Sequence, residues 1–274
     1  MKKYIFLFLM LINVLLYGEF EANIAVYNTL RLGRGKKDYV QMAKGIEKFQ
    51  LIGLVEVMSK KGIENLVDAL EKVSGEKWDY HLAPYAVGTG KYREYYGYVY
   101  KRKDVKFIKS NGYFPDEKEW FIREPYGSTF KINNFDFTLV LVHSIFGKSQ
   151  SQRRAEAFKL DEVYDYFQNQ DKKEKDIIIA GDFNLSANDE AFEQLIGHKD
   201  KIMYAIDPGI KTTIGKKGFS SSYDNFFLSA IHTKEFTGKS GAIDTTFGEY
   251  SETRKNISDH IPIFINVLTG EDDD

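Results

Sequence analysis

Short apolar runs alternate with segments of helical periodicity along this chain. The runs that predict buried strands cover residues 21–27, 51–55, 78–83, 95–100, 136–142, 177–181 and 226–229, and a last run ends at residue 268. Apolar residues spaced three and four apart predict helices at 39–49, 63–73 and 154–167, and a short helix follows through residue 196. Strands that alternate with helices predict an α/β fold with parallel strand pairs.

Polar side chains stand directly after several of these strands. Glu56 follows residues 51–55, His143 follows the strand at 136–142, and Asp182 and Asn184 follow residues 177–181. Because the carboxyl ends of parallel strands meet at one edge of a sheet, where α/β proteins bind ligands, we expect these side chains to share one rim. Each of them alone is also compatible with a strand-end turn, a solvated acid or a structural histidine. Their repetition favours a site.

Residues 1–18 have the pattern of a secretory signal peptide. Two lysines precede an apolar segment at 4–16, and Gly18 ends it. The segment is too short for a comfortable membrane span, and no second apolar run of spanning length follows. We therefore expect an exported chain, secreted or periplasmic, in which residues 19–274 form a single domain.

Composition excludes a global basic surface. Without the two lysines of the signal peptide, 36 basic residues face 40 acidic ones, which gives a formal charge of −4. No overall positive field therefore indicates a nucleic-acid partner. The chain has no cysteine, so its stability rests on its core, and about 250 residues are enough for one large α/β domain.

Four short segments together carry a specific pattern: Leu-Val-Glu56-Val, Gly-Asp182-Phe-Asn184, Tyr-Asp224-Asn and Ser-Asp259-His260. In this order they resemble the endonuclease/exonuclease/phosphatase superfamily of metal-dependent phosphoesterases over nearly all of residues 19–274. Three further segments are similar to its deoxyribonuclease I branch: Tyr92-Arg-Glu94, Arg123-Glu-Pro125 and Val142-His-Ser144. The resemblance implies a four-layer α-β-β-α sandwich, in which two mixed sheets are flanked by helices and the site lies at one sheet edge.

The resemblance also implies a role for each of these residues. His143 and His260 form an acid/base pair, oriented by Glu94 and Asp224 respectively, because a neighbouring carboxylate raises a histidine's pKa and fixes its tautomer. We expect His260 to activate water and His143 to assist the leaving group. The implied catalytic set is His143, His260, Glu94, Asp224, Asp182 and Asn184, the implied metal set is Glu56, Asp259, Asn28 and Asp182, and the implied substrate-binding set is Tyr92, Arg123, Asn28 and Asn184.

Oxygen donors dominate the implied metal set. Carboxylate and amide oxygens suit a hard cation, so we expect Mg²⁺, with Mn²⁺ or Ca²⁺ as alternatives. A chain without cysteine and with oxygen-rich ligands disfavours zinc. One position departs from the deoxyribonuclease I branch, since Met58 stands where that branch carries a basic residue that enters the minor groove.

These features predict an exported, divalent-metal-dependent endonuclease that hydrolyses DNA phosphodiester bonds with little sequence specificity. We expect a monomer that binds the phosphate backbone of double-stranded DNA. The same machinery could instead serve a lipid-headgroup phosphoesterase of the sphingomyelinase or phosphoinositide phosphatase type, and a non-catalytic binding protein is a third reading. DNA is favoured over lipid because the loops at 29–37 and 211–222 are basic and polar, whereas a membrane substrate calls for an exposed apolar element.

Overall fold

The computed structural model describes residues 20–272 and places two six-stranded mixed sheets face to face. One sheet has the order β11-β12-β1-β2-β4-β3, with β1 Glu21–Leu32, β2 Leu51–Val57, β3 Trp78–Leu82, β4 Tyr95–Lys101, β11 Phe236–Ala242 and β12 Ile263–Leu268. The other has the order β5-β6-β7-β8-β10-β9, with β5 Val105–Tyr113, β6 Tyr126–Ile132, β7 Phe135–His143, β8 Ile177–Asp182, β9 Ile202–Tyr204 and β10 Asp224–Ser229.

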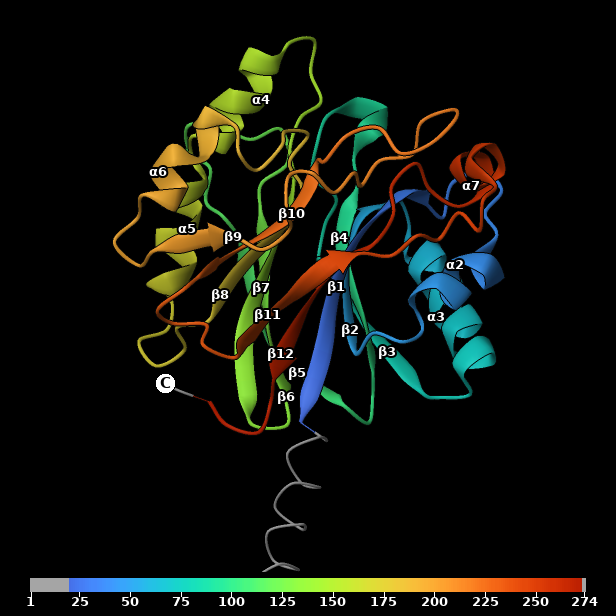
Figure 1. Ribbon diagram of the computed structural model, residues 1–274, viewed down its shortest axis with the longest axis horizontal. Coiled ribbons are helices and arrows are strands. Elements are labelled where there is room, and N and C mark those ends of the chain that lie inside the picture. Colours follow the sequence, from blue (N-terminus) through green and yellow to red (C-terminus); the bar gives the residue numbers. More distant parts are fainter. Residues whose placement is uncertain (1–19, 273–274) are drawn as a thin grey trace, which may run out of the picture.

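Helices cover the outer face of each sheet. The main ones are α2 Tyr39–Ile46, α3 Lys60–Ser74, α4 Gln150–Ala157, α5 Leu160–Gln168, α6 Glu193–Ile196 and α7 Tyr250–Asn256. Figure 1 shows α4, α5 and α6 on one side of the paired sheets and α2 and α3 on the other. The predicted four-layer α-β-β-α sandwich is therefore confirmed. Among residues 20–272, every helix is too short or too polar to cross a bilayer.

The core between the sheets is rich in aromatic side chains. Tyr96, Tyr98, Tyr126 and Phe130 are all buried there. The hydroxyl of Tyr98 lies 3.0 Å from the carbonyl oxygen of Tyr126 and 2.9 Å from that of Leu139, so β4 of one sheet is hydrogen-bonded to β6 and β7 of the other. Because a buried hydroxyl costs free energy unless it is paired, these bonds specify how the two sheets face each other.

Two strand pairs are parallel, and they set the position of the candidate site. β1 pairs with β2, and β7 pairs with β8. Gly181 near the end of β8 has a φ of +153°, and a Cβ there would lie 1.8 Å from the carbonyl oxygen of Val142 on β7. A side chain would force these two strands apart, so the glycine is required for β8 to deliver Asp182 beside His143. Asp182 and His143 are register partners in the β7–β8 pair.

The strand predictions locate most elements but not the sheet that holds each. β2 and β8 were expected to place acids on one rim of one sheet, and this is wrong because the two strands belong to different sheets. The helix predicted at 154–167 is two helices that break at Phe158 and Lys159. β5, β6, β9, β11 and α7 were not predicted. β5 is an edge strand in which Lys106 and Lys109 interrupt the apolar pattern. The predicted signal peptide lies outside the described residues.

Candidate active site

A cleft of about 550 Å³ opens where the carboxyl ends of β1, β2, β7 and β8 meet. Because the two sheets face each other, their polar strand ends converge from opposite sides. The amide of Asn28 on β1 donates to Asp182 on β8 at 3.0 Å, across 154 residues of sequence. Seven side chains singled out from the sequence line the cleft: Asn28, Glu56, His143, Asp182, Asn184, Asp259 and His260.

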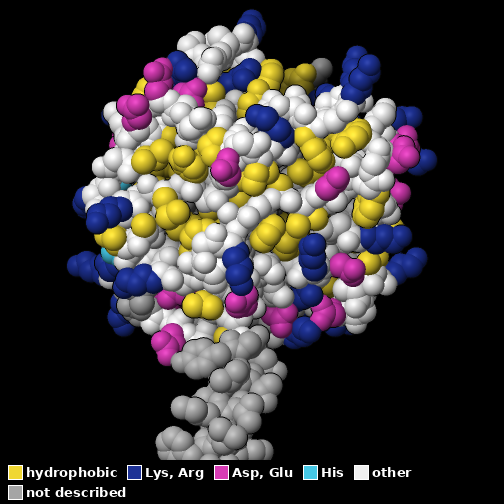
Figure 2. All heavy atoms as spheres, viewed as in Figure 1, with side chains coloured by type: hydrophobic (Ala, Val, Ile, Leu, Met, Phe, Trp, Pro, Cys, Tyr) yellow, Lys and Arg dark blue, Asp and Glu magenta, His cyan; other side chains and the backbone are white. Residues whose placement is uncertain are grey.

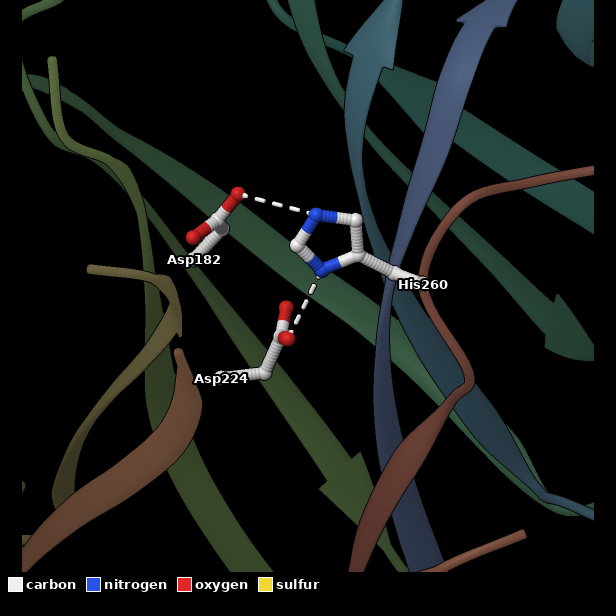
Figure 3. Close-up of side chains that lie close together, drawn as sticks. All are labelled: Asp182, Asp224 and His260. Carbon is white, nitrogen blue, oxygen red and sulfur yellow. Dashed lines mark hydrogen bonds and ion pairs between the residues drawn. The ribbon is translucent and has the colours of Figure 1, made fainter. Parts of the chain in front are cut away.

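His260 lies between two carboxylates (Figure 3). Its Nδ1 is 2.8 Å from Asp224 Oδ2, and its Nε2 is 3.5 Å from Asp182 Oδ2. The hydroxyl of Thr212, which is fully buried, donates to the same Asp224 oxygen at 2.6 Å and fixes that carboxylate. An Nδ1–H donated to Asp224 leaves Nε2 directed into the cleft.

The environment of His260 strongly favours its charged form. Burial opposes the charge, but the nearby negative charges of Asp224 and Asp182 outweigh it and raise the pKa of His260 to about 10. Burial also raises the pKa of Asp182, which lies completely inside the protein. In the protein alone, His260 is therefore protonated at neutral pH.

His143 is held in the same way by an acid of the other sheet. Its Nδ1 is 2.7 Å from Glu94 Oε1, and Glu94 Oε2 is 3.0 Å from Nε of Arg123. Burial opposes a charge on His143, but the negative charge of Glu94 prevails and raises the pKa of the imidazole. Burial likewise opposes a charged Glu94, and the positive charges of His143 and Arg123 hold its pKa below the ordinary value.

Asp182 connects the two histidines. Its Oδ2 lies 3.7 Å from His143 Nε2 and 3.5 Å from His260 Nε2, so both imidazoles turn their free nitrogen toward one oxygen. Its Oδ1 accepts a hydrogen bond from the backbone N–H of Asn184 at 2.9 Å. The arrangement is two carboxylate-bound imidazoles around a central buried acid, which is suited to moving one proton in and one proton out.

Glu56 and Asp259 supply further oxygen donors to the cleft, and Glu56 Oε1 lies 4.0 Å from Nε2 of His143. Glu56 has a left-handed backbone with φ of +60°, at a register shift between β2 and β4. That conformation is uncommon for a side chain larger than glycine, and such strain concentrates at functional positions. The amide nitrogen of Asn28 donates to Glu56 Oε1 at 3.2 Å and thereby links this carboxylate to Asp182.

Comparisons with known proteins agree with this geometry, although no family model matches the chain. A deoxyribonuclease of Thioalkalivibrio sp. (strain K90mix) is 25% identical over 259 residues, which is 89% of this chain and 70% of that protein. A deoxyribonuclease-1-like 1 protein of Sus scrofa is 26% identical over 94% of this chain and 85% of its own length.

Solved structures share the fold. An endonuclease/exonuclease/phosphatase family protein of Bacteroides thetaiotaomicron has a TM-score of 0.62 at 14% identity, over 91% of this chain and 98% of that one. A mannosyl-6-phosphatase of the same species has a TM-score of 0.61 at 16% identity, over 90% of this chain and 100% of that one. The chain is therefore similar to proteins of the endonuclease/exonuclease/phosphatase superfamily, and to deoxyribonucleases among them. Its similarity to deoxyribonucleases supports a phosphodiesterase or nuclease activity.

Members of this superfamily that resemble deoxyribonuclease I depend on a metal, and the donor set here fits a hard cation. Lys37 shows that negative charge gathers here. Burial lowers the pKa of Lys37 to about 8, and the negative charges of Glu56 and Asp259 partly offset this lowering. Both carboxylates therefore lie close to one ammonium group. Asp182, Asp224 and His260 also place ligand atoms within 4.8 Å of one another. We favour Glu56 and Asp259 over this cluster as the cation ligands, because Asp224 Oδ2 already accepts from Thr212 and pairs with His260.

Two residues expected to bind substrate lie differently from the metal and acid/base residues. Tyr92 is 51% exposed, as expected, but it is not among the residues that line the cleft, and its contact with substrate stays a prediction. Arg123 was also expected to bind substrate, but its side chain is only 13% exposed and pairs with Glu94. Its charge therefore acts on His143 through Glu94.

Several residues that complete the site were not identified from the sequence. Thr212 is a single threonine in a polar loop, so nothing in its surroundings marks it as the support of Asp224. Arg31 and Arg254 line the cleft and bring positive charge to it. Arg31 belongs to the basic loop at 29–37, which was noted, but a bulge in β1 between Asn28 and Leu32 is what turns this segment into the cleft.

His260 is expected to make stability depend on pH. Because its folded pKa of about 10 exceeds its ordinary value of about 6.5, its contribution is complete below pH 6.5 and is lost as the pH rises to 10. The difference in the free energy of unfolding between the wild type and His260→Gln should therefore shrink from pH 6 to pH 10, measured by urea unfolding.

His81→Gln provides the matched control, because burial lowers the pKa of His81. A histidine with a lowered folded pKa costs stability as the pH falls below its unfolded value, so the His81 difference should change between pH 6.5 and pH 5 and stay constant above. A His260 difference that is constant from pH 6 to pH 10 would contradict the assignment of a charged His260.

Proposed function

We propose that this chain is an exported, divalent-metal-dependent endonuclease that hydrolyses DNA phosphodiester bonds with little sequence specificity. One observation carries the proposal: His143 and His260, each bound to its own carboxylate, turn Nε2 toward the same oxygen of Asp182 beside an oxygen-lined cation position. Phosphodiester hydrolysis needs a water to lose a proton and an alkoxide to gain one, which two such imidazoles can perform.

Each histidine has a role set by its surroundings. His260, whose Nδ1–H is held by Asp224, takes a proton from the attacking water at Nε2 in its neutral form, which requires that a bound cation first lower its pKa. His143, held by Glu94 and charged, gives a proton from Nε2 to the leaving oxygen. When bound by Glu56 and Asp259, a divalent cation would neutralise phosphate charge and lower the pKa of the nearby histidines. Asn184, which lines the cleft beside Asp182, is placed to contact a phosphate oxygen.

The surface favours a polyanionic substrate, bound by positive charge at the cleft, over a membrane substrate. Figure 2 shows lysine and arginine side chains interspersed with acids on one face, and its apolar side chains lie in several small patches. Positive charge at the cleft comes from Arg31 and Arg254, and the guanidinium of Arg254 is positioned by a hydrogen bond to the carbonyl of Ile214 at 3.2 Å. Phosphates next to the one that reacts would meet these charges at the cleft.

The substrate is tested by measuring three reactions side by side in Mg²⁺: nicking of supercoiled plasmid, hydrolysis of sphingomyelin vesicles and hydrolysis of phosphoinositide vesicles. We expect the highest kcat/KM with DNA. Lipid hydrolysis faster than plasmid nicking would overturn the nuclease proposal and leave a phosphoesterase of the same superfamily.

Binding to DNA should depend on salt through the two cleft arginines. Each phosphate contact adds about one unit to the slope of log K against log salt, so Arg31→Gln and Arg254→Gln should each reduce that slope by about 1. Binding of a duplex oligonucleotide in EDTA gives the measurement. Lys239→Gln is the control, because Lys239 pairs with Glu21 at the start of β1, at the opposite end of the sheet from the cleft. Equal slopes in all four proteins would contradict this placement of DNA.

A further inference from the structure

Phe146 is an exposed aromatic residue beside the catalytic groups. It follows His143 by three residues, lines the same cleft, and is 58% exposed. It therefore contributes little to the core, and an exposed ring of this size costs solvation free energy unless something covers it. Its position at the mouth of the cleft makes the ring available to a bound substrate.

Arg153 of α4 holds this ring in place. Its guanidinium lies over the Phe146 ring at 4.0 Å from the centroid, and its Nε donates to the carbonyl of Phe146 at 2.7 Å. Nη1 of Arg153 also donates to the carbonyl of Asn184 at 3.3 Å and to the hydroxyl of Tyr223 at 3.4 Å. A cation over one face of a ring fixes that ring and leaves the opposite face for another flat group.

A second hollow continues from this point. It has a volume of about 670 Å³, and Asn184 and Tyr223 line both it and the catalytic cleft. Its wall holds Arg153 and the polar side chains of Gln150 and Asn188, and its two acids, Asp189 and Glu190, are both paired with Arg154. A nucleic-acid strand whose phosphate occupies the cleft therefore has a polar path past Phe146.

We propose that Phe146, backed by Arg153, is a stacking platform for an unpaired nucleobase next to the scissile phosphate. This inference rests on the proposed nuclease function and adds a specificity to it. Every base has a flat π-face, so such a platform tolerates any sequence, in keeping with low sequence specificity. A base paired within a duplex does not present its face, so the platform favours single-stranded or locally unpaired DNA.

The test compares kcat/KM of wild type, Phe146→Ala and Phe146→Trp on a single-stranded oligonucleotide and on the duplex of the same sequence. Since stacking is worth about 1–3 kcal/mol per base, Phe146→Ala should lower the single-strand to duplex ratio of kcat/KM by about 5- to 150-fold. Phe146→Trp should restore the ratio. Phe247→Ala is the matched control, because Phe247 is 60% exposed but does not line the cleft, and it should keep the wild-type ratio.

Binding in EDTA to a single strand with abasic sites on both sides of one phosphate adds a readout without turnover. Wild type should lose affinity when the bases are removed, and Phe146→Ala should lose none. Equal sensitivity of both proteins to base removal, or an unchanged ratio in Phe146→Ala, would overturn the platform while the nuclease function stands. No cleavage of either DNA by the wild type would overturn both.

Discussion

Replacing His260 by alanine is expected to lower kcat by about 10²-fold or more, the usual contribution of a positioned acid or base. The imidazole lies between Asp224 and Asp182, and alanine removes the Nε2 that faces Asp182. Plasmid nicking at saturating DNA measures the effect, and circular dichroism verifies the fold. His198→Ala is the control, because His198 is also a largely buried histidine paired with an acid, Asp165, but lies outside the cleft.

The same loss is expected for His143→Ala. The double variant should lose less kcat than the product of the two single losses, because the two imidazoles act on one reaction through one acid, Asp182. Strict multiplication would show that they act independently. A near wild-type kcat in either single variant would remove that histidine from the mechanism.

Glu56→Gln is expected to abolish activity while the fold stays nearly intact. Glutamine keeps the size of the side chain but removes the negative charge that a hard cation requires. Mg²⁺ binding should weaken in calorimetric titration, and Mg²⁺ should raise the melting temperature of the variant less than that of the wild type. Glu162→Gln on α5 is the control, because Glu162 is an exposed acid paired with Lys159. Wild-type turnover by Glu56→Gln at low Mg²⁺ would exclude Glu56 as a ligand.

Arg123 illustrates how position changes the meaning of a residue. The sequence predicts a substrate-binding arginine, whereas the structure has its Nε 3.0 Å from Glu94, which orients His143. Arg123→Ala should therefore act on kcat as well. The motif identifies the residue, but only the packing of the loop against Glu94 shows which group it contacts.

The sequence located the strand ends of the site because apolar runs stop at polar residues, as at Glu56 and Asp182. It did not show that these acids come from two different sheets, because periodicity describes one strand and carries no information on its neighbours. Long-range contacts complete the site: the hydroxyl of Ser258 donates to the carbonyl of Asn28 across 230 residues. Such contacts follow from the packing of the whole chain and leave no local pattern.

Phe146 and Thr212 were missed for a related reason. An aromatic residue after a strand is usually part of the core, and a threonine in a polar loop is usually solvated. Their roles depend on Arg153 and Asp224, which approach from other elements. The family resemblance identified the residues expected to take part in the chemistry. The supporting residues depend on the geometry of this particular chain.

Nicking of supercoiled plasmid tests directly whether the two histidines around Asp182 hydrolyse DNA with a divalent cation. Wild type is compared in Mg²⁺ and in EDTA, and His260→Ala is run in Mg²⁺. We expect wild type to produce open circles in Mg²⁺ and none in EDTA, and the variant to be slower by about 10²-fold or more. Two results would contradict this mechanism: nicking by wild type in EDTA at the rate seen in Mg²⁺, or nicking by His260→Ala in Mg²⁺ at the wild-type rate.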